Sequence, residues 1–177
     1  MTKNILEWLE ASCLKHPNQI AVADETAEMT YEELVKDAKI LGTKLATYIQ
    51  PRQAVAMYME KGNTTLAAMY GAVYAGGFYS LIDTRQPIGR IEKILEVLNP
   101  NVILSNERFY EEAREKLGPT VNIVKVEDII REGNVDENML AGIRKQAAST
   151  DPLYVNFTSG STGVPKGVVV GHGSVID

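Results

Sequence analysis

One segment near the end of the chain has a composition suited to binding phosphate groups. Residues 158–167 read Thr-Ser-Gly-Ser-Thr-Gly-Val-Pro-Lys-Gly and lie between two apolar runs. Glycines let backbone amides approach a ligand, hydroxyls add hydrogen-bond donors, and Lys166 adds a positive charge. A plain turn between two strands is the simpler interpretation. We favour a phosphate-binding loop, because a turn does not need so many small and hydroxylated residues together with a lysine.

The segment does not fit the Walker A motif of nucleotide-binding proteins. That motif has glycine directly before its lysine and Ser or Thr directly after it. Here Pro165 precedes Lys166 and Gly167 follows it. A helix should also begin just after the lysine of a P-loop, whereas residues 168–170 are three valines that predict a strand.

The rest of the chain predicts an α/β fold in which strands and helices alternate around a largely parallel sheet. The nearly uninterrupted apolar run at 54–59 indicates a strand covered on both faces. Thr30 and Glu33 have the spacing of a capping box and predict a helix start. The polar stretch 127–150 predicts loops with helical pieces. The predicted strands are 20–23, 29–31, 54–59, 78–82, 102–104, 121–126, 153–157 and 168–170, and the predicted helices are 5–14, 31–49, 64–75, 87–98 and 107–117.

Composition excludes several classes of function. The net charge of -5 disfavours binding to nucleic acid or to an anionic membrane surface. One cysteine and two histidines are too few to predict a zinc site or an internal disulfide, so no metal-binding residue is assigned. No apolar stretch is long enough to predict a membrane span. We therefore predict a cytoplasmic protein.

Three segments of the chain resemble sequence elements of one enzyme family. Residues 158–167 resemble the T-S-G-S-T-G-x-P-K-G signature of adenylate-forming (AMP-binding) enzymes, which include acyl-CoA synthetases and amino-acid adenylation domains. Residues 29–34 resemble the early T-Y-x-E-L element of that family. Residues 75–83, followed by Pro87 and Arg90, resemble the A-G-x-x-Y-V-P-I-D element of amino-acid adenylation domains, with Ser80 and Leu81 in place of Val-Pro.

The resemblance implies the N-terminal portion of the family's large domain and a specific chemistry. The family uses ATP and Mg2+ to activate a carboxylic acid as an acyl adenylate, releases pyrophosphate, and passes the acyl group to a thiol of CoA or of a carrier protein's phosphopantetheine. The 75–83 element favours an amino acid as the acid. Lys166 is the implied catalytic residue, which stabilises phosphate charge. The implied ATP-binding residues are Thr158, Ser159, Gly160, Ser161, Thr162, Gly163, Lys166 and Gly167.

The resemblance also implies that essential groups lie downstream of residue 177. In the family the adenine-binding segment, the magnesium ligand and the acyl pocket all follow the signature loop. We therefore expect residues 1–177 to be an N-terminal fragment that is inactive alone and that self-associates through apolar surface left uncovered. The alternative is a non-catalytic module of the same fold that binds a nucleotide, a phosphate or a partner.

Other candidate residues have simpler interpretations. His172 is predicted to be structural or merely near the site, and Cys13 is predicted to be a buried, inert thiol. Asp83 is predicted to make structural hydrogen bonds. Glu111 and Glu112 are predicted to be solvated neighbours rather than an acid/base pair. An aromatic group is predicted to pack in the core, although it could line a pocket of an intact enzyme: Tyr70, Tyr74, Phe78 and Tyr79.

Overall fold

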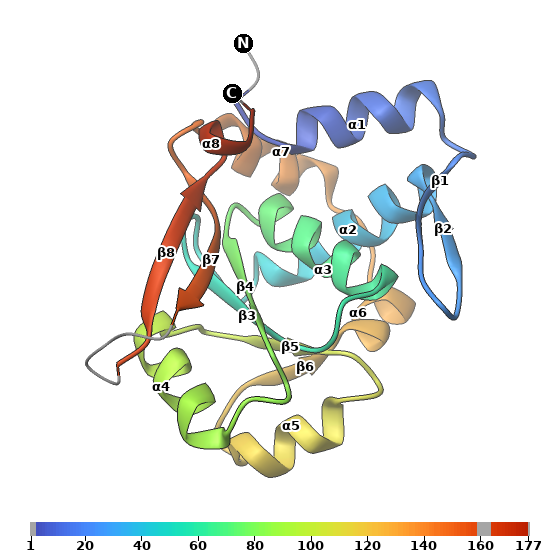
Figure 1. The fold of residues 1–177 in the computed structure, drawn as a ribbon. Helices are drawn as coiled ribbons and strands as arrows, with labels where there is room; N and C mark the ends of the chain where they lie inside the picture. The colour runs from blue at the N-terminus through green and yellow to red at the C-terminus, as the bar shows by residue number, and fades with distance from the viewer. Residues whose placement is uncertain (1–2, 159–163, 177) are drawn as a thin grey trace.

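A six-stranded sheet forms the centre of the protein (Figure 1). The computed structural model describes residues 3–158 and 164–176 of the chain. Strand order is β6-β5-β3-β4-β7-β8, and every neighbouring pair is parallel except the antiparallel pair β7 and β8. The predicted α/β fold with a largely parallel sheet is confirmed. The strands are β3 (Ala54–Tyr58), β4 (Phe78–Ile82), β5 (Ile103–Ser105), β6 (Ile123–Lys125), β7 (Pro152–Thr158) and β8 (Lys166–Gly171).

Helices cover both faces of this sheet (Figure 1). The connection from β3 to β4 runs in the opposite direction along the sheet from the connections β4 to β5 and β5 to β6. Right-handed crossovers therefore place α3 on one face and α4 and α5 on the other. The helices α1, α2, α6 and α7 pack with α3. The helices are α1 (Leu6–Lys15), α2 (Tyr31–Leu45), α3 (Asn63–Tyr74), α4 (Ile88–Leu98), α5 (Tyr110–Leu117), α6 (Val126–Glu132), α7 (Glu137–Lys145) and α8 (Gly173–Ile176).

Helices α2 and α3 pack closely against each other, and their contact depends on two glycines. A Cβ atom at Gly42 would lie 2.5 Å from the Cβ of Tyr74, and one at Gly71 would lie 2.6 Å from the Cβ of Leu41. Real Cβ atoms do not approach other atoms so closely. The absence of side chains at these two positions lets the helices pack closely over the core.

A separate two-stranded sheet precedes α2 and stabilises the starts of two helices. It pairs β1 (Ile20–Ala23) with β2 (Glu28–Thr30). Thr30 and Glu33 form the predicted capping box at the start of α2. In the turn between β1 and β2, Asp24 accepts a hydrogen bond of 3.0 Å from the amide of Asn63, which begins α3. This bond and further ones from Thr26 hold the pKa of Asp24 well below its usual range.

Sequence prediction located most elements and missed some boundaries. Residues 127–150 contain α7 and most of α6, which are the helical pieces predicted there between loops. The strand predicted at 121–126 is shorter, because Val126 already begins α6. These polar helices offer few apolar residues to recognise in the sequence, since each buries only one or two side chains. Within the described ranges, no helix is both long and apolar enough to cross a lipid bilayer.

Candidate functional site at the carboxyl edge of the sheet

The ends of the predicted phosphate-binding loop lie at the carboxyl edge of the parallel strands, where ligands bind in open α/β sheets. Thr158 ends β7 and Lys166 begins β8 directly opposite it, so their side chains share one face of the hairpin. The Thr158 hydroxyl donates a long hydrogen bond of 3.5 Å to the Lys166 carbonyl. No helix begins at Lys166, as predicted. Five candidate residues lie outside the described residues: Ser159, Gly160, Ser161, Thr162 and Gly163.

The charge of Lys166 is available to an anion. Its side chain is exposed, and no acidic side chain of the described chain lies within ion-pair distance of it. Pro165, next to it, is buried and anchors this end of the loop. The buried proline restrains the backbone next to the exposed lysine, and such preorganisation favours a contact with phosphate.

Gly167 has a packing role within the hairpin. A Cβ atom at this position would lie 3.0 Å from Cγ1 of Val155 and 3.3 Å from Cε1 of Phe157. Both neighbours belong to β7, so glycine lets their side chains lie across β8. This packing explains Gly167 without a ligand, and its predicted ATP contact stays a prediction.

A crevice of about 540 Å³ opens at the same edge, between the ends of β3 and β4. The connection after β3 passes over one face of the sheet, and the connection after β4 passes over the other face. In open α/β folds, a cleft forms where the connections of two neighbouring strands diverge in this way. The crevice therefore follows from the strand order. Its lining combines an apolar floor with charged residues: Met59, Glu60, Lys61, Leu81, Ile82, Asp83, Thr84 and Arg85.

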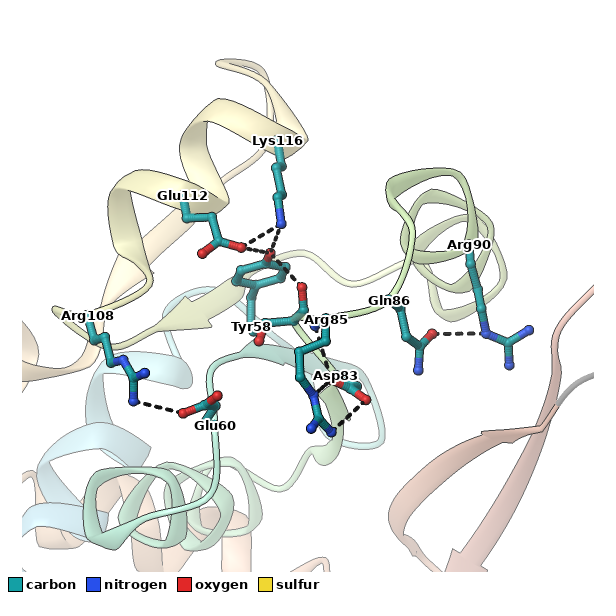
Figure 2. Close-up of polar contacts among 10 residues, drawn as sticks. Tyr58, Glu60, Asp83, Arg85, Gln86, Arg90, Arg108, Glu112 and Lys116 are labelled. Carbon is teal, nitrogen blue, oxygen red and sulfur yellow. Dashed lines mark hydrogen bonds and ion pairs between the residues drawn. The ribbon is translucent and has the colours of Figure 1, made fainter. Parts of the chain in front are cut away.

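Ion pairs stiffen the rim of the crevice (Figure 2). Arg85 donates to Asp83 at 3.0 Å, and Arg108 donates to Glu60 at 2.8 Å. The hydrogen bonds from Arg85 hold the pKa of Asp83 below its usual range. Asp83 makes the predicted hydrogen bonds, although its side chain is exposed at the crevice, and the choice of a structural role over a ligand contact stays a prediction.

A three-residue network pins α5 to the end of β3 (Figure 2). The buried Tyr58 hydroxyl donates to Glu112 at 2.7 Å, and Lys116 donates to the same carboxylate oxygen at 2.6 Å. Burial raises the pKa of Tyr58, and the hydrogen bond to Glu112 raises it further. The bonds from Lys116 and Tyr58 lower the pKa of Glu112. Tyr58 is therefore a neutral donor and not a base.

Glu112 is solvated as predicted, since 39% of its side chain is exposed, but its hydrogen bonds with Tyr58 and Lys116 were not predicted. The spacing in the sequence indicates the ion pair within this network, because Glu112 and Lys116 are four residues apart on a helix. The third member, Tyr58, could not be paired with them from sequence, since 54 residues separate it from Glu112. Glu111 is exposed, as predicted.

The residues that resemble the adenylation element at 75–83 have structural reasons for their types. Gly76 adopts a positive φ of 76°, which favours glycine, and a Cβ at Gly77 would lie 2.7 Å from the Gln53 carbonyl. The hydroxyl of Ser80 donates to the Val155 carbonyl at 2.9 Å and ties β4 to β7. Further along, Gln86 accepts a hydrogen bond of 2.9 Å from Arg90 in α4 (Figure 2).

His172 has a structural role, as predicted. It lies just past β8, is 2% exposed, and accepts a hydrogen bond of 3.3 Å at Nδ1 from the Ile5 amide. It thereby joins the end of β8 to the start of the chain. Burial lowers the pKa of His172, so the imidazole stays neutral. Cys13 is half-buried rather than fully buried.

Tyr74 and Tyr79, two members of the predicted aromatic group, have different surroundings. Tyr74 is buried and donates to Glu10 in α1 at 2.9 Å, which is a packing role. Tyr79 stacks on Tyr154 with ring centroids 5.9 Å apart. Burial raises the pKa of Tyr79 to about 12. Core packing is confirmed for Tyr74, and the partly buried Tyr70 and Tyr79 pack against the core.

Comparison with known proteins adds family information to this geometry. A sequence model described as AMP-binding enzyme matches residues 9–177. The chain is 36% identical over 173 residues to the nonribosomal peptide synthetase fmqA of Aspergillus fumigatus, and the aligned region covers 95% of this chain and 4% of that protein. It is 33% identical over 161 residues to the nonribosomal peptide synthase roqA of Penicillium rubens, covering 90% of this chain and 7% of that protein. The chain thus spans a small part of these relatives.

Solved structures show the same fold. A nonribosomal peptide synthetase, FmoA3, superposes with a TM-score of 0.82 at 30% identity, covering 96% of this chain and 17% of that chain. It has also been solved in an AMPPNP-bound form. The N-terminal subdomain of Klebsiella oxytoca NpsA superposes with a TM-score of 0.77 at 19% identity, over 97% of this chain and 42% of that chain.

Proposed function

The chain belongs to the AMP-binding enzyme family, and on that premise we propose that residues 1–177 form the N-terminal part of an adenylation domain that activates a carboxylic acid with ATP. The carboxylate attacks the α-phosphate, pyrophosphate leaves, and an acyl adenylate remains. The acyl group then passes to the thiol of a carrier protein's phosphopantetheine or of CoA.

One observation carries the proposal: Lys166 is an exposed cation with no ion-pair partner in the described chain, held at the carboxyl edge opposite Thr158. The γ- and β-phosphates would lie against this end of the hairpin. Lys166 would stabilise the negative charge that develops on the departing pyrophosphate. The Thr158 hydroxyl and the glycine-rich residues 159–163 would supply the remaining hydrogen bonds.

An amino acid is the substrate class we propose. The two relatives described above match over nearly the whole chain and are peptide synthetases, and residues 75–83 resemble the element of amino-acid adenylation domains. Mg2+ would accompany ATP and neutralise phosphate charge, with its protein ligand downstream of this segment. The side chains that select the acid would also lie downstream.

The experiment is exchange of labelled pyrophosphate into ATP by the full-length gene product, screened over amino acids and small carboxylic acids. Lys166→Ala should lower the exchange rate by about 100-fold, because an electrostatic donor aimed at developing charge is worth that much. Lys15→Ala is the matched control, since Lys15 is exposed at the end of α1. Unchanged exchange in the Lys166 variant would contradict the proposed role.

The 177-residue chain alone should show no exchange, because the proposed adenine and magnesium contacts are not part of it. Exchange above background from the purified chain would overturn this part of the proposal. A full-length product that binds ATP but exchanges no pyrophosphate with any acid would favour the alternative, a non-catalytic binding module.

A further inference from the structure

The hairpin of β7 and β8, which carries Lys166, joins the rest of the sheet near only one of its ends. β7 pairs with β4 through Tyr154 and Tyr79, and the Ser80 hydroxyl adds a bond to the next residue of β7. The two strands then diverge toward their carboxyl ends (Figure 1). Among the described residues, the half of the hairpin that holds Lys166 therefore has no backbone pairing with β4. Its position depends on the other end, the base, where β7 begins and β8 ends.

His172 closes this base, because three segments of the chain meet at it. Its amide donates to the Asp151 carbonyl at 3.1 Å, and the next amide, of Gly173, donates to the Ser149 carbonyl at 2.7 Å. Both carbonyls lie just before β7. The imidazole Nδ1 accepts from the Ile5 amide at 3.3 Å, across 167 residues of sequence. The side chain of His172 therefore ties the base of the hairpin to the segment that leads into α1.

Only a neutral imidazole can make this contact with Ile5. A small cavity of about 20 Å³ lies beside His172, and its charged or titratable lining residues are Tyr74, Arg144 and Asp151. Arg144 and Asp151 each form an ion pair with another side chain. Burial lowers the pKa of His172, Asp151 raises it in part, and Arg144 lowers it. Protonation would place a hydrogen on Nδ1, facing the Ile5 amide, and would break the bond.

We propose that His172 is a positioning residue: it holds the base of the hairpin and thereby sets the place of Lys166 against the phosphates of ATP. The proposal rests on the proposed function, since it needs Lys166 to act on phosphate charge. β8 pairs with β7 from Lys166 to Val170, so the hairpin moves as one unit. A tilt at His172 is carried along β8 to Lys166, about 20 Å away. Misplacement by about 1 Å can cost an enzyme about 100-fold in rate.

Pyrophosphate exchange by the full-length gene product tests the proposal, because any support from downstream segments is then present. His172→Leu removes the acceptor and should slow exchange about tenfold. His172→Asn supplies an amide oxygen in place of Nδ1 and should restore at least half of the rate. The matched control is Thr43→Val, which removes an acceptor of the Asp136 amide between α2 and α7. Equal losses in His172→Leu and Thr43→Val, or no rescue by asparagine, would overturn the proposal.

A double variant tests whether His172 acts through the lysine. Adding His172→Leu to Lys166→Ala should slow exchange less than twofold further, because the group to be positioned is already gone. A further tenfold loss would overturn the proposal. If Lys166→Ala slows exchange and His172→Leu does not, this inference alone fails. If Lys166→Ala leaves exchange unchanged, the proposed role of the lysine fails and this inference fails with it.

The pH dependence of exchange gives a test that needs only the wild type and His172→Asn. Protonation removes the acceptor from the wild type but not from the asparagine variant. The ratio of wild-type to variant exchange should therefore be constant above the ordinary histidine pKa of about 6.5 and fall as the pH drops below it. A ratio that stays constant down to the pH at which the protein unfolds would contradict the positioning role, even if His172→Leu does not fold.

Discussion

Strands β3 and β8 belong to the same sheet and have similarly apolar sequences, yet their surroundings differ completely. All five residues of β3 are buried, whereas the first four of β8 are exposed. β3 lies between β4 and β5 and under helices, and β8 lies at the margin. Position in the sheet therefore decides burial, because both apolar runs predict strands in the sequence and only one of these strands is covered in the described structure.

The largest expected effect comes from disturbing the helical layer over the central strands. Gly71→Ala forces a Cβ atom to within 2.6 Å of Leu41, and overpacking of this kind costs about 1–3 kcal/mol of unfolding free energy. Gly142→Ala is the control, because Gly142 has open space around it in α7 and should gain up to about 1 kcal/mol. Urea unfolding measures both. Equal effects of the two changes would contradict the account of helix packing.

The same substitution in both strands tests the comparison itself. Val55→Ala removes buried methyl groups from β3 and should lower the free energy of unfolding by about 2 kcal/mol. Val169→Ala on the exposed face of β8 should change it by no more than about 0.5 kcal/mol. Urea unfolding of dilute, monomeric protein measures the difference. Similar losses at both positions would show that β8 is covered.

Among the described residues, the start of β8 has no side-chain network like the one at the end of β3. Tyr58→Phe removes the hydroxyl that donates to Glu112 and should destabilise the fold by about 1–2 kcal/mol. Tyr154→Phe keeps the ring that stacks on Tyr79 and should be nearly neutral. Thermal unfolding compares the two variants. A neutral Tyr58→Phe would mean that the network adds no stability.

His172, the buried residue just past β8, gives the smallest effect, and that effect depends on pH. Because burial lowers its folded-state pKa, protonation favours the unfolded chain, whose histidine titrates near about 6.5. Stability should therefore be full above that pH and fall as the pH drops below it. His172→Asn keeps an acceptor for the Ile5 amide without titrating. Parallel pH profiles of the wild type and this variant would contradict the assignment.

The sequence predicted what local rules control. The capping box at Thr30 and Glu33, the buried strand β3 and the two strands that flank the predicted loop all follow from neighbouring residues, and all were confirmed. Contacts between distant segments were not predicted. Asp24 meets Asn63 and Tyr58 meets Glu112 only because the topology brings them together.

The candidate site was predicted in part for the same reason. The decapeptide at 158–167 identified the loop because its residue types lie in one run. The crevice between β3 and β4 depends on strand order, which the sequence did not reveal, and its lining comes from two separate segments. The paired charges on its rim could be recognised only after the strands had been placed.

Asp24 has a consequence for the order of folding. Its carboxylate accepts from the amide that begins α3, 39 residues further along the chain, and the N-cap position, Gly62, has no side chain to do so. The amide of Asn63 therefore gains this partner only after the β1–β2 turn has docked. These two segments should consequently open and close as one cooperative unit, with matching rates of amide hydrogen exchange.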